Sequence, residues 1–300
     1  MPAYTRRRFL STTLTLATAL ELRRAAFAFG LSQDSAVCTF APEQEVGPYY
    51  VADELIRSEI AESKAGIPLT LRLAILDART CKPLPNAAVD IWHCDALGLY
   101  SGYTKASMGS GGLPPGGGPG NGPGGMPPGP PPGFANGPNG HPMGPPPQMH
   151  TTDKLTFLRG IQITGQDGAV SFRTIFPGIY PGRTNHIHFK VHIGGHPNQS
   201  TYKEGHVSHT GQVFFPEDVA IDLMQREPYA QHKIHRTTQA EDMVFNSQTG
   251  AKSISILKPI DPGNPSAGFR AELIAAVDPT ATPTPANRMD GPGGPPQSRP

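Results

Sequence analysis

The feature that most limits how this chain can fold is a tract rich in Gly and Pro. Of the 40 residues from 109 to 148, 29 are Gly or Pro. No strict Gly-X-Y period runs through them, which excludes a collagen-like triple helix. Such a composition cannot bury enough apolar surface to offset the entropy lost on ordering. We therefore interpret residues 109–148 as a disordered insertion, and the Pro-, Thr- and Gly-rich residues 279–300 as a disordered tail.

The first 28 residues have the layout of an export signal. The run TRRRFL at residues 5–10 resembles the twin-arginine type, and mostly small or apolar residues follow up to Leu20. Ala26-Phe27-Ala28 is a candidate A-x-A cleavage site, with Ala17-Thr18-Ala19 as the other. We expect residues 1–28 to direct export to the periplasm or the cell exterior. A basic amphipathic N-terminal helix is the alternative.

The remaining residues are enough for one domain. Without residues 1–28, 109–148 and 279–300, 210 residues are left, which can bury a substantial core. We predict a single domain over 29–278, in which apolar and polar residues alternate with the period of two that is typical of half-buried strands. The predicted strands are Pro68–Asp77, Ala87–Cys94, Phe157–Thr164, Ala169–Phe176, His186–Ile193, Gly211–Phe215, Ser253–Leu257 and Phe269–Val277, and a helix is predicted over Pro216–Gln225. This pattern favours an all-β, mainly antiparallel β-sandwich with long loops and one or two short helices.

Charge and cysteine content exclude several classes of protein. The net charge is +1, and about −3 without the arginine-rich residues 1–28, so no basic stripe remains to bind nucleic acid. The sequence contains no run of 18 apolar residues, so we expect no stable insertion in a membrane. Three cysteines without a CxxC pair exclude a disulfide scaffold and a zinc ribbon. Cys81, at a turn, and Cys94, at a strand end, are awkwardly placed to pair, whereas Cys38 could pair with either.

The chemistry-bearing residues cluster in three short segments, 89–103 with Tyr100, 176–191 with Tyr180 and the histidines, and 211–215 with Gln212. His186 and His188 are two apart on a predicted strand, so both imidazoles point to the same face. Tyr180 lies on a turn between two Pro-Gly pairs, and Tyr100 follows another predicted strand. Two phenolates and two imidazoles suit Fe(III), whose charge the phenolates offset, better than zinc. His192 continues the same strand face and is interpreted as structural.

Five segments together resemble one family. They are EQEVGPYYV (43–51), VDIWHCDALGLYSGY (89–103), FLRGIQIT (157–164), FPGIYPGRTNHIHFKV (176–191) and TGQVFFPEDV (210–219). They are similar to segments of the intradiol ring-cleavage dioxygenases, which include protocatechuate 3,4-dioxygenase and catechol 1,2-dioxygenase. The resemblance runs from about Thr39 to Asp278, and the family fold is a β-sandwich.

The resemblance implies a function and a role for each matching residue. The implied reaction is the cleavage of a catechol by O2 at non-haem Fe(III), giving a cis,cis-muconate-type dicarboxylate. The implied iron ligands are Tyr100, Tyr180, His186 and His188. Tyr180 is the ligand that leaves the iron when substrate binds. The resemblance also assigns Arg183 to stabilising negative charge on the substrate, places Gln212 near the substrate and gives Tyr49 a place in the pocket wall. A homo-oligomer is left open.

Two other functions are compatible with parts of the sequence. A non-catalytic secreted β-sandwich module would use the Gly/Pro tract as a spacer and hold no coloured metal. A zinc hydrolase would use the His186 and His188 pair, together with a third His or carboxylate ligand and a general base.

Overall fold

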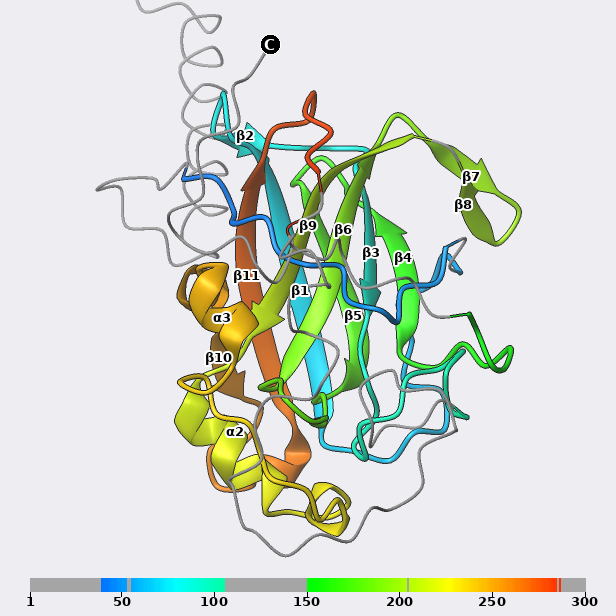
Figure 1. Ribbon diagram of the computed structural model, residues 1–300. Coiled ribbons are helices and arrows are strands. Elements are labelled where there is room, and N and C mark those ends of the chain that lie inside the picture. The colour runs from blue at the N-terminus through cyan, green and yellow to red at the C-terminus, as the bar shows by residue number, and fades with distance from the viewer. Residues whose placement is uncertain (1–38, 53–54, 106–149, 204, 285, 287–300) are drawn as a thin grey trace, which may run out of the picture. The chain divides into compact units, whose positions relative to one another are not determined.

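Two β-sheets packed face to face form the body of the protein, shown by the computed structural model in Figure 1. The structure describes residues 39–52, 55–105, 150–203, 205–284 and 286. The predicted signal (1–28), the Gly/Pro tract, Cys38 and residues 287–300 of the predicted tail lie outside this range. The described residues from Phe40 onward form one compact unit.

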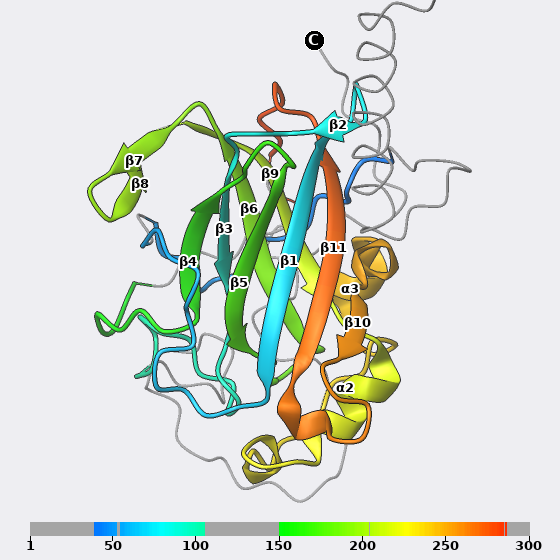
Figure 2. The ribbon, with the colours of Figure 1, turned by 180° about the vertical axis from the view of Figure 1, so that it is seen from behind.

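The first sheet has five strands and includes a parallel pair. Its strand order is β10-β11-β1-β2, with β5 also pairing with β1. Figure 2 views the molecule from the side of this sheet. The strands are β1 (Pro68–Asp77), β2 (Lys82–Pro83), β5 (Ala169–Ile175), β10 (Ile256–Pro259) and β11 (Phe269–Val277). β1 and β11 pair in parallel, and the other pairs in this sheet are antiparallel.

The second sheet is antiparallel and has the strand order β4-β3-β6-β9. Its strands are β3 (Ala88–Trp92), β4 (Arg159–Ile163), β6 (His186–Ile193) and β9 (His206–Phe214). A separate ribbon joins β7 (His196–Asn198) and β8 (Thr201–Lys203). The described helices are α2 (Glu217–Met224), α3 (Met243–Ser247), and the short 3-10 helices η1 (Tyr229–Gln231), η2 (Gly250–Ser253) and η3 (Pro265–Ala267).

The predicted fold class is therefore confirmed: the described residues form an all-β sandwich with long loops and short helices. β1 has the predicted bounds, because strict alternation of apolar side chains marks a strand buried on one face. The predicted strand at Ser253–Leu257 is wrong in its position, since Ser253 ends η2 and β10 begins at Ile256. The β7–β8 ribbon was not predicted, because each of its strands is only three residues long, too short to show a period of two.

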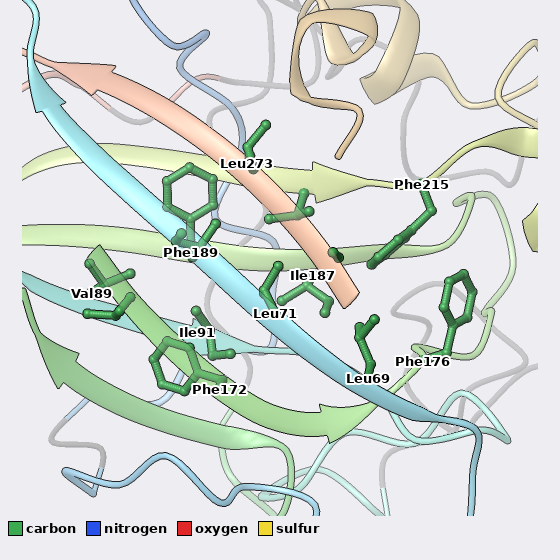
Figure 3. Packing of buried hydrophobic residues seen from close by; sticks show 14 of the residues in the cluster. Leu69, Leu71, Val89, Ile91, Phe172, Phe176, Ile187, Phe189, Phe215 and Leu273 are labelled. Atoms are coloured by element: carbon green, nitrogen blue, oxygen red, sulfur yellow. The ribbon is translucent and has the colours of Figure 1, made fainter. Parts of the chain in front are cut away.

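The core lies between the two sheets. Alternate residues of β1, such as Leu69 and Leu71, meet Val89 and Ile91 of β3 and Ile187 of β6, as Figure 3 shows. Each fully buried side chain of this kind contributes about 1.5–3 kcal/mol. These residues occupy one face of β3 and β6, so the intervening residues point to the opposite face of the second sheet. That outer face carries the chemistry.

The segment from Gln44 to Val51 covers the outer face and keeps it buried. The backbone N–H of Gln44 donates to the carbonyl of Thr210 on β9 at 2.9 Å. The side-chain oxygen of Gln44 accepts from the backbone N–H of Gln212 at 2.6 Å. As a result the polar face of β6 near His186 and His188 is buried as deeply as its apolar face.

Candidate metal centre

The two histidines of β6 present their ring nitrogens to a single point. His186 and His188 are both buried on the outer face, and their Nε2 atoms lie 3.1 Å apart. The Nδ1 of His186 donates to the backbone carbonyl of Thr184 at 2.6 Å, which places the ring proton on Nδ1. The Nε2 of His186 is therefore an electron-pair donor that faces His188.

Tyr180 reaches the same point from the turn before β6. Its hydroxyl donates to the Nε2 of His186 at 3.1 Å. Gly182, with a φ of +84°, allows the tight turn through which the backbone N–H of Arg183 reaches the carbonyl of Tyr180 at 3.3 Å. The side chain of Asn185 donates to the carbonyls of Pro177 and Gly178, so the turn is tied to the start of the strand.

Tyr100 comes from the loop after β3. The carboxylate of Asp95 accepts the backbone N–H groups of Leu97 and Leu99 and shapes this loop. The ring of Tyr100 is fully buried, with its centroid 5.7 Å from that of Tyr180. Its hydroxyl makes no hydrogen bond of normal geometry with the described residues. The fold thus brings Tyr100, Tyr180, His186 and His188 together.

Burial controls the protonation of all four side chains. Desolvation lowers the pKa of His186 and of His188 well below the usual value, and the nearby Arg183 charge lowers both further. Desolvation raises the pKa of the Tyr100 and Tyr180 phenols, and each is raised further by the neighbouring Cys94. The imidazoles are therefore neutral and ready to bind a metal, whereas the phenols need a bound cation in order to ionise.

The geometry of these atoms fits a single metal ion. Two imidazole nitrogens bound to one ion at about 2.0–2.1 Å stand about 2.8–3.4 Å apart when the bond angle is about 90–110°. The observed 3.1 Å between the Nε2 atoms agrees with this, as does the 3.1 Å between the Tyr180 hydroxyl and His186. Within the described ranges, no group of three His, Cys, Asp or Glu could hold a metal. The third ligand that a zinc hydrolase needs is thus not found there.

Arg183 lies beside this centre in a buried cluster of polar groups. Its Nε donates to both oxygens of Asp242, at 3.0 and 3.2 Å, and Nη1 donates to Glu45 at 3.3 Å. Its Nη2 donates to the side-chain oxygen of Gln212. Gln212 lies opposite His188 on β9, which places it next to the ligand pair. Arg183 and Gln212 are therefore brought to the site together.

Two carboxylates of this cluster were missed by the sequence analysis. Glu45 lies in the EQEVGPYYV segment, where its position beside other polar residues offered a weak signal. Asp242 lies 59 residues after Arg183, in a segment with no motif. Because both are held against Arg183 by tertiary packing, only the folded structure identifies them.

Aromatic rings form the walls of the candidate centre. Tyr49 stacks on Tyr100 with ring centroids 4.6 Å apart, so it lies beside one of the candidate ligands. Trp92 stacks in parallel on His188, with centroids 4.9 Å apart. His192 lies further along the strand and faces Asp90 at 3.8 Å, so it does not join the ligand group.

Two of the cysteines differ in their bonding state. Cys81 is disulfide-bonded, and Cys94 is a free thiol buried against Tyr100. Because Cys94 is free, the sequence-based alternatives that paired it are excluded.

The fold and site together define a β-sandwich protein with a buried centre of two tyrosines and two histidines. In solved structures the chain is similar to an intradiol ring-cleavage dioxygenase from Tetranychus urticae, with 31% identity and a TM-score of 0.61 over 83% of this chain and 98% of that one. It is also similar to another dioxygenase crystal structure, with 32% identity and a TM-score of 0.62 over 82% and 97% of the two chains. The catechol 1,2-dioxygenase from Acinetobacter sp. ADP1 is a distant match, at 19% identity and a TM-score of 0.43 over 86% of this chain and 67% of that one.

No protein-family model matches this sequence, and no curated protein matches it. The identity to the first two structures, over nearly their whole length, is enough to place the chain. It belongs to the intradiol ring-cleavage dioxygenases, and it is an enzyme of the oxidoreductase class. Among the described residues, no helix is long and apolar enough to cross a membrane.

Proposed function

We propose that the protein uses a non-haem Fe(III) ion, held by Tyr100, Tyr180, His186 and His188, to cleave a catechol with O2. The product is a cis,cis-muconate-type dicarboxylate. The observation that carries this proposal is the convergence of the two Nε2 atoms and the Tyr180 hydroxyl at 3.1 Å spacings, beside the buried Tyr100 hydroxyl. In a member of this family, that donor set suits a trivalent ion because two phenolates offset most of its charge.

Iron held by these four residues would supply the Lewis-acid and redox chemistry that makes the ring of a catechol reactive towards O2. The protein would supply the proton acceptor, since the phenolate oxygen of Tyr180 could take a proton from the catechol. Burial favours this step, because desolvation raises the pKa of the Tyr180 phenol and so stabilises its protonated form.

Arg183 and the aromatic walls carry the other roles. The guanidinium of Arg183 is permanently charged and stabilises negative charge that builds on the ring during the reaction. Gln212, bonded to Arg183, borders the substrate. The ring of Tyr49, stacked on Tyr100, offers a flat surface for the substrate ring and shields it from water.

The test compares two histidines on the same strand face. The purified parent protein is expected to contain iron, to absorb in the visible range through tyrosinate-to-Fe(III) charge transfer, and to convert a catechol to a diacid with the mass of substrate plus O2. His186→Ala should lose iron, colour and turnover. The control His192→Ala should keep all three, since His192 faces Asp90 instead.

Three results would overturn the proposal. The first is a colourless parent that retains zinc. The second is a ring-opened aldehyde product instead of a diacid. The third is a His186→Ala variant that keeps its iron and its visible absorption.

We also propose that residues 1–28 export the enzyme. The disulfide at Cys81 supports this, since stable disulfides are typical of oxidising compartments outside the cytoplasm. Replacing Arg6, Arg7 and Arg8 by Lys should keep the protein in the cytoplasm of a host with twin-arginine export, as measured by cell fractionation. Unchanged export of that variant would refute the proposal.

A further inference from the structure

One buried carboxylate joins the arginine of the site to a helix far away in sequence. Asp242 is fully buried, and both of its oxygens accept from the Nε of Arg183, at 3.0 and 3.2 Å. The same carboxylate accepts the backbone N–H groups of Val244 and Phe245 and so caps the N-terminus of α3. Its position is thus held by the helix as well as by Arg183.

Asp242 also holds the backbone that leads into the ligand strand. One of its oxygens accepts the backbone N–H of Thr184 at 2.9 Å. The carbonyl of the same Thr184 accepts from the Nδ1 of His186 at 2.6 Å. A single carboxylate therefore contacts both the side chain of Arg183 and the backbone of Thr184, the residue whose carbonyl bonds to the ring of His186.

The other end of α3 supports the same cluster. Gln248, the C-cap residue, accepts the backbone N–H of Glu45 through its side chain at 2.8 Å. The carbonyl of Glu45 accepts from the side-chain amide of Gln212 at 3.0 Å. Of the two residues that cap α3, Asp242 thus bonds to Arg183 directly, and Gln248 is linked to Gln212 through the backbone of Glu45.

This arrangement explains how a long side chain is held in one orientation. Free arginine has many rotamers, and ordering it costs entropy. Because Asp242 bonds to the Nε of the Arg183 guanidinium, Nη1 is left to bond to Glu45 and Nη2 to bond to Gln212. The guanidinium is therefore oriented before substrate binds, and a preorganised charge needs no rearrangement during the reaction.

We propose that Asp242 is a positioning residue of this enzyme, which acts on the reaction by orienting Arg183. The inference rests on the proposed function for its kinetic consequence. Its structural part, the orientation of Arg183 by Asp242, holds in the metal-free protein and can be tested there.

The first test is Asp242→Asn. Asn caps helices as well as Asp does, so α3 is expected to form. The amide keeps one acceptor oxygen but turns an NH2 group towards the N–H donors of Arg183 and Thr184. We expect kcat on a catechol to fall about 10²-fold, the scale for losing one oriented electrostatic donor, with little change in KM. Iron content and visible absorption should stay at the parent level.

The matched control is Glu241→Gln. It removes the neighbouring carboxylate, which is exposed and bonds to Thr238 and His235 instead of the site. Its kcat and KM should equal those of the parent. Equal losses in both variants would refute a specific role for Asp242.

A double-mutant cycle separates positioning from general structural support. If Asp242 acts through Arg183, the variant with both Asp242→Asn and Arg183→Gln should be no slower than Arg183→Gln alone. If the fold-loss of kcat in the double variant equals the product of the losses in the two single variants, the proposal is wrong.

A second readout needs neither metal nor substrate. In the metal-free parent, the Nε–H of Arg183 is buried against a carboxylate, so its NMR signal should be resolved and exchange slowly with solvent. Asp242→Asn should abolish that protection. If the variant does not fold, Asp242→Ser provides the same test, because serine also caps helices but is too short to reach Arg183. Retained protection in either variant would refute the inference, whereas an inactive parent with the expected NMR result would refute only the proposed function.

Discussion

Removing the side chain of Arg183 should lower the free energy of unfolding of the metal-free protein, in addition to any effect on turnover. The guanidinium lies between the carboxylates of Asp242 and Glu45, and its side chain is 1% exposed. Arg183→Ala would leave these carboxylates buried without their shared cation. Breaking a buried ion pair from one side typically costs about 3–5 kcal/mol, because the remaining charge is uncompensated. For a protein of this size, that corresponds to a fall in Tm of about 6–20 °C.

The assay is urea unfolding of the metal-free parent and variants, followed by fluorescence or circular dichroism. The control is Arg226→Ala, which breaks a surface pair with Asp222 one helical turn away and should cost only about 0.3–0.5 kcal/mol. Adding Glu45→Gln to Arg183→Ala should recover part of the loss, because it removes one of the two buried charges. If Arg183→Ala stays within about 1 kcal/mol of the parent, the carboxylates are not held there as charges and the reasoning is wrong.

Two further predictions follow from single residues near the centre. Gly47 has a φ of +67°, and an added Cβ would lie 3.2 Å from the ring of His188. Gly47→Ala should therefore weaken iron binding about 10–100-fold, as measured by competition with a chelator. The control Gly194→Ala, also at positive φ but with open space around it, should leave iron binding unchanged. Burial lowers the pKa of His93 to about 4, whereas the unfolded chain takes up this proton near 6.5. The metal-free protein should therefore lose about 3 kcal/mol of unfolding free energy through His93 as pH falls from 6.5 to 4. His93→Gln should remove that part of the pH dependence. If the unfolding free energy of the variant depends on pH as that of the parent does, His93 is not the group responsible.

Local sequence patterns were sufficient to predict most strands of the two sheets and to select four candidate ligands. Alternation with a period of two depends only on the backbone geometry of a strand, so β1 could be predicted with its correct bounds. The same rule placed His186 and His188 on one face from their spacing alone. Tyr180 stood out because the Pro-Gly pairs on either side fix a turn. Each of these inferences needs only residues that are neighbours in the chain.

The tertiary structure decided which distant residues complete the site. Asp242 and Glu45 reach Arg183 from 59 and 138 residues away, and their own segments carry no motif for that contact. The parallel pairing of β1 with β11 and the covering of β6 by residues 44–51 were equally hidden. Such contacts depend on how two sheets and their connecting loops pack, because burying an arginine requires counter-charges from whichever segments the fold brings beside it. Sequence therefore determined which side chains form the candidate metal centre, and packing determined the charges that surround them.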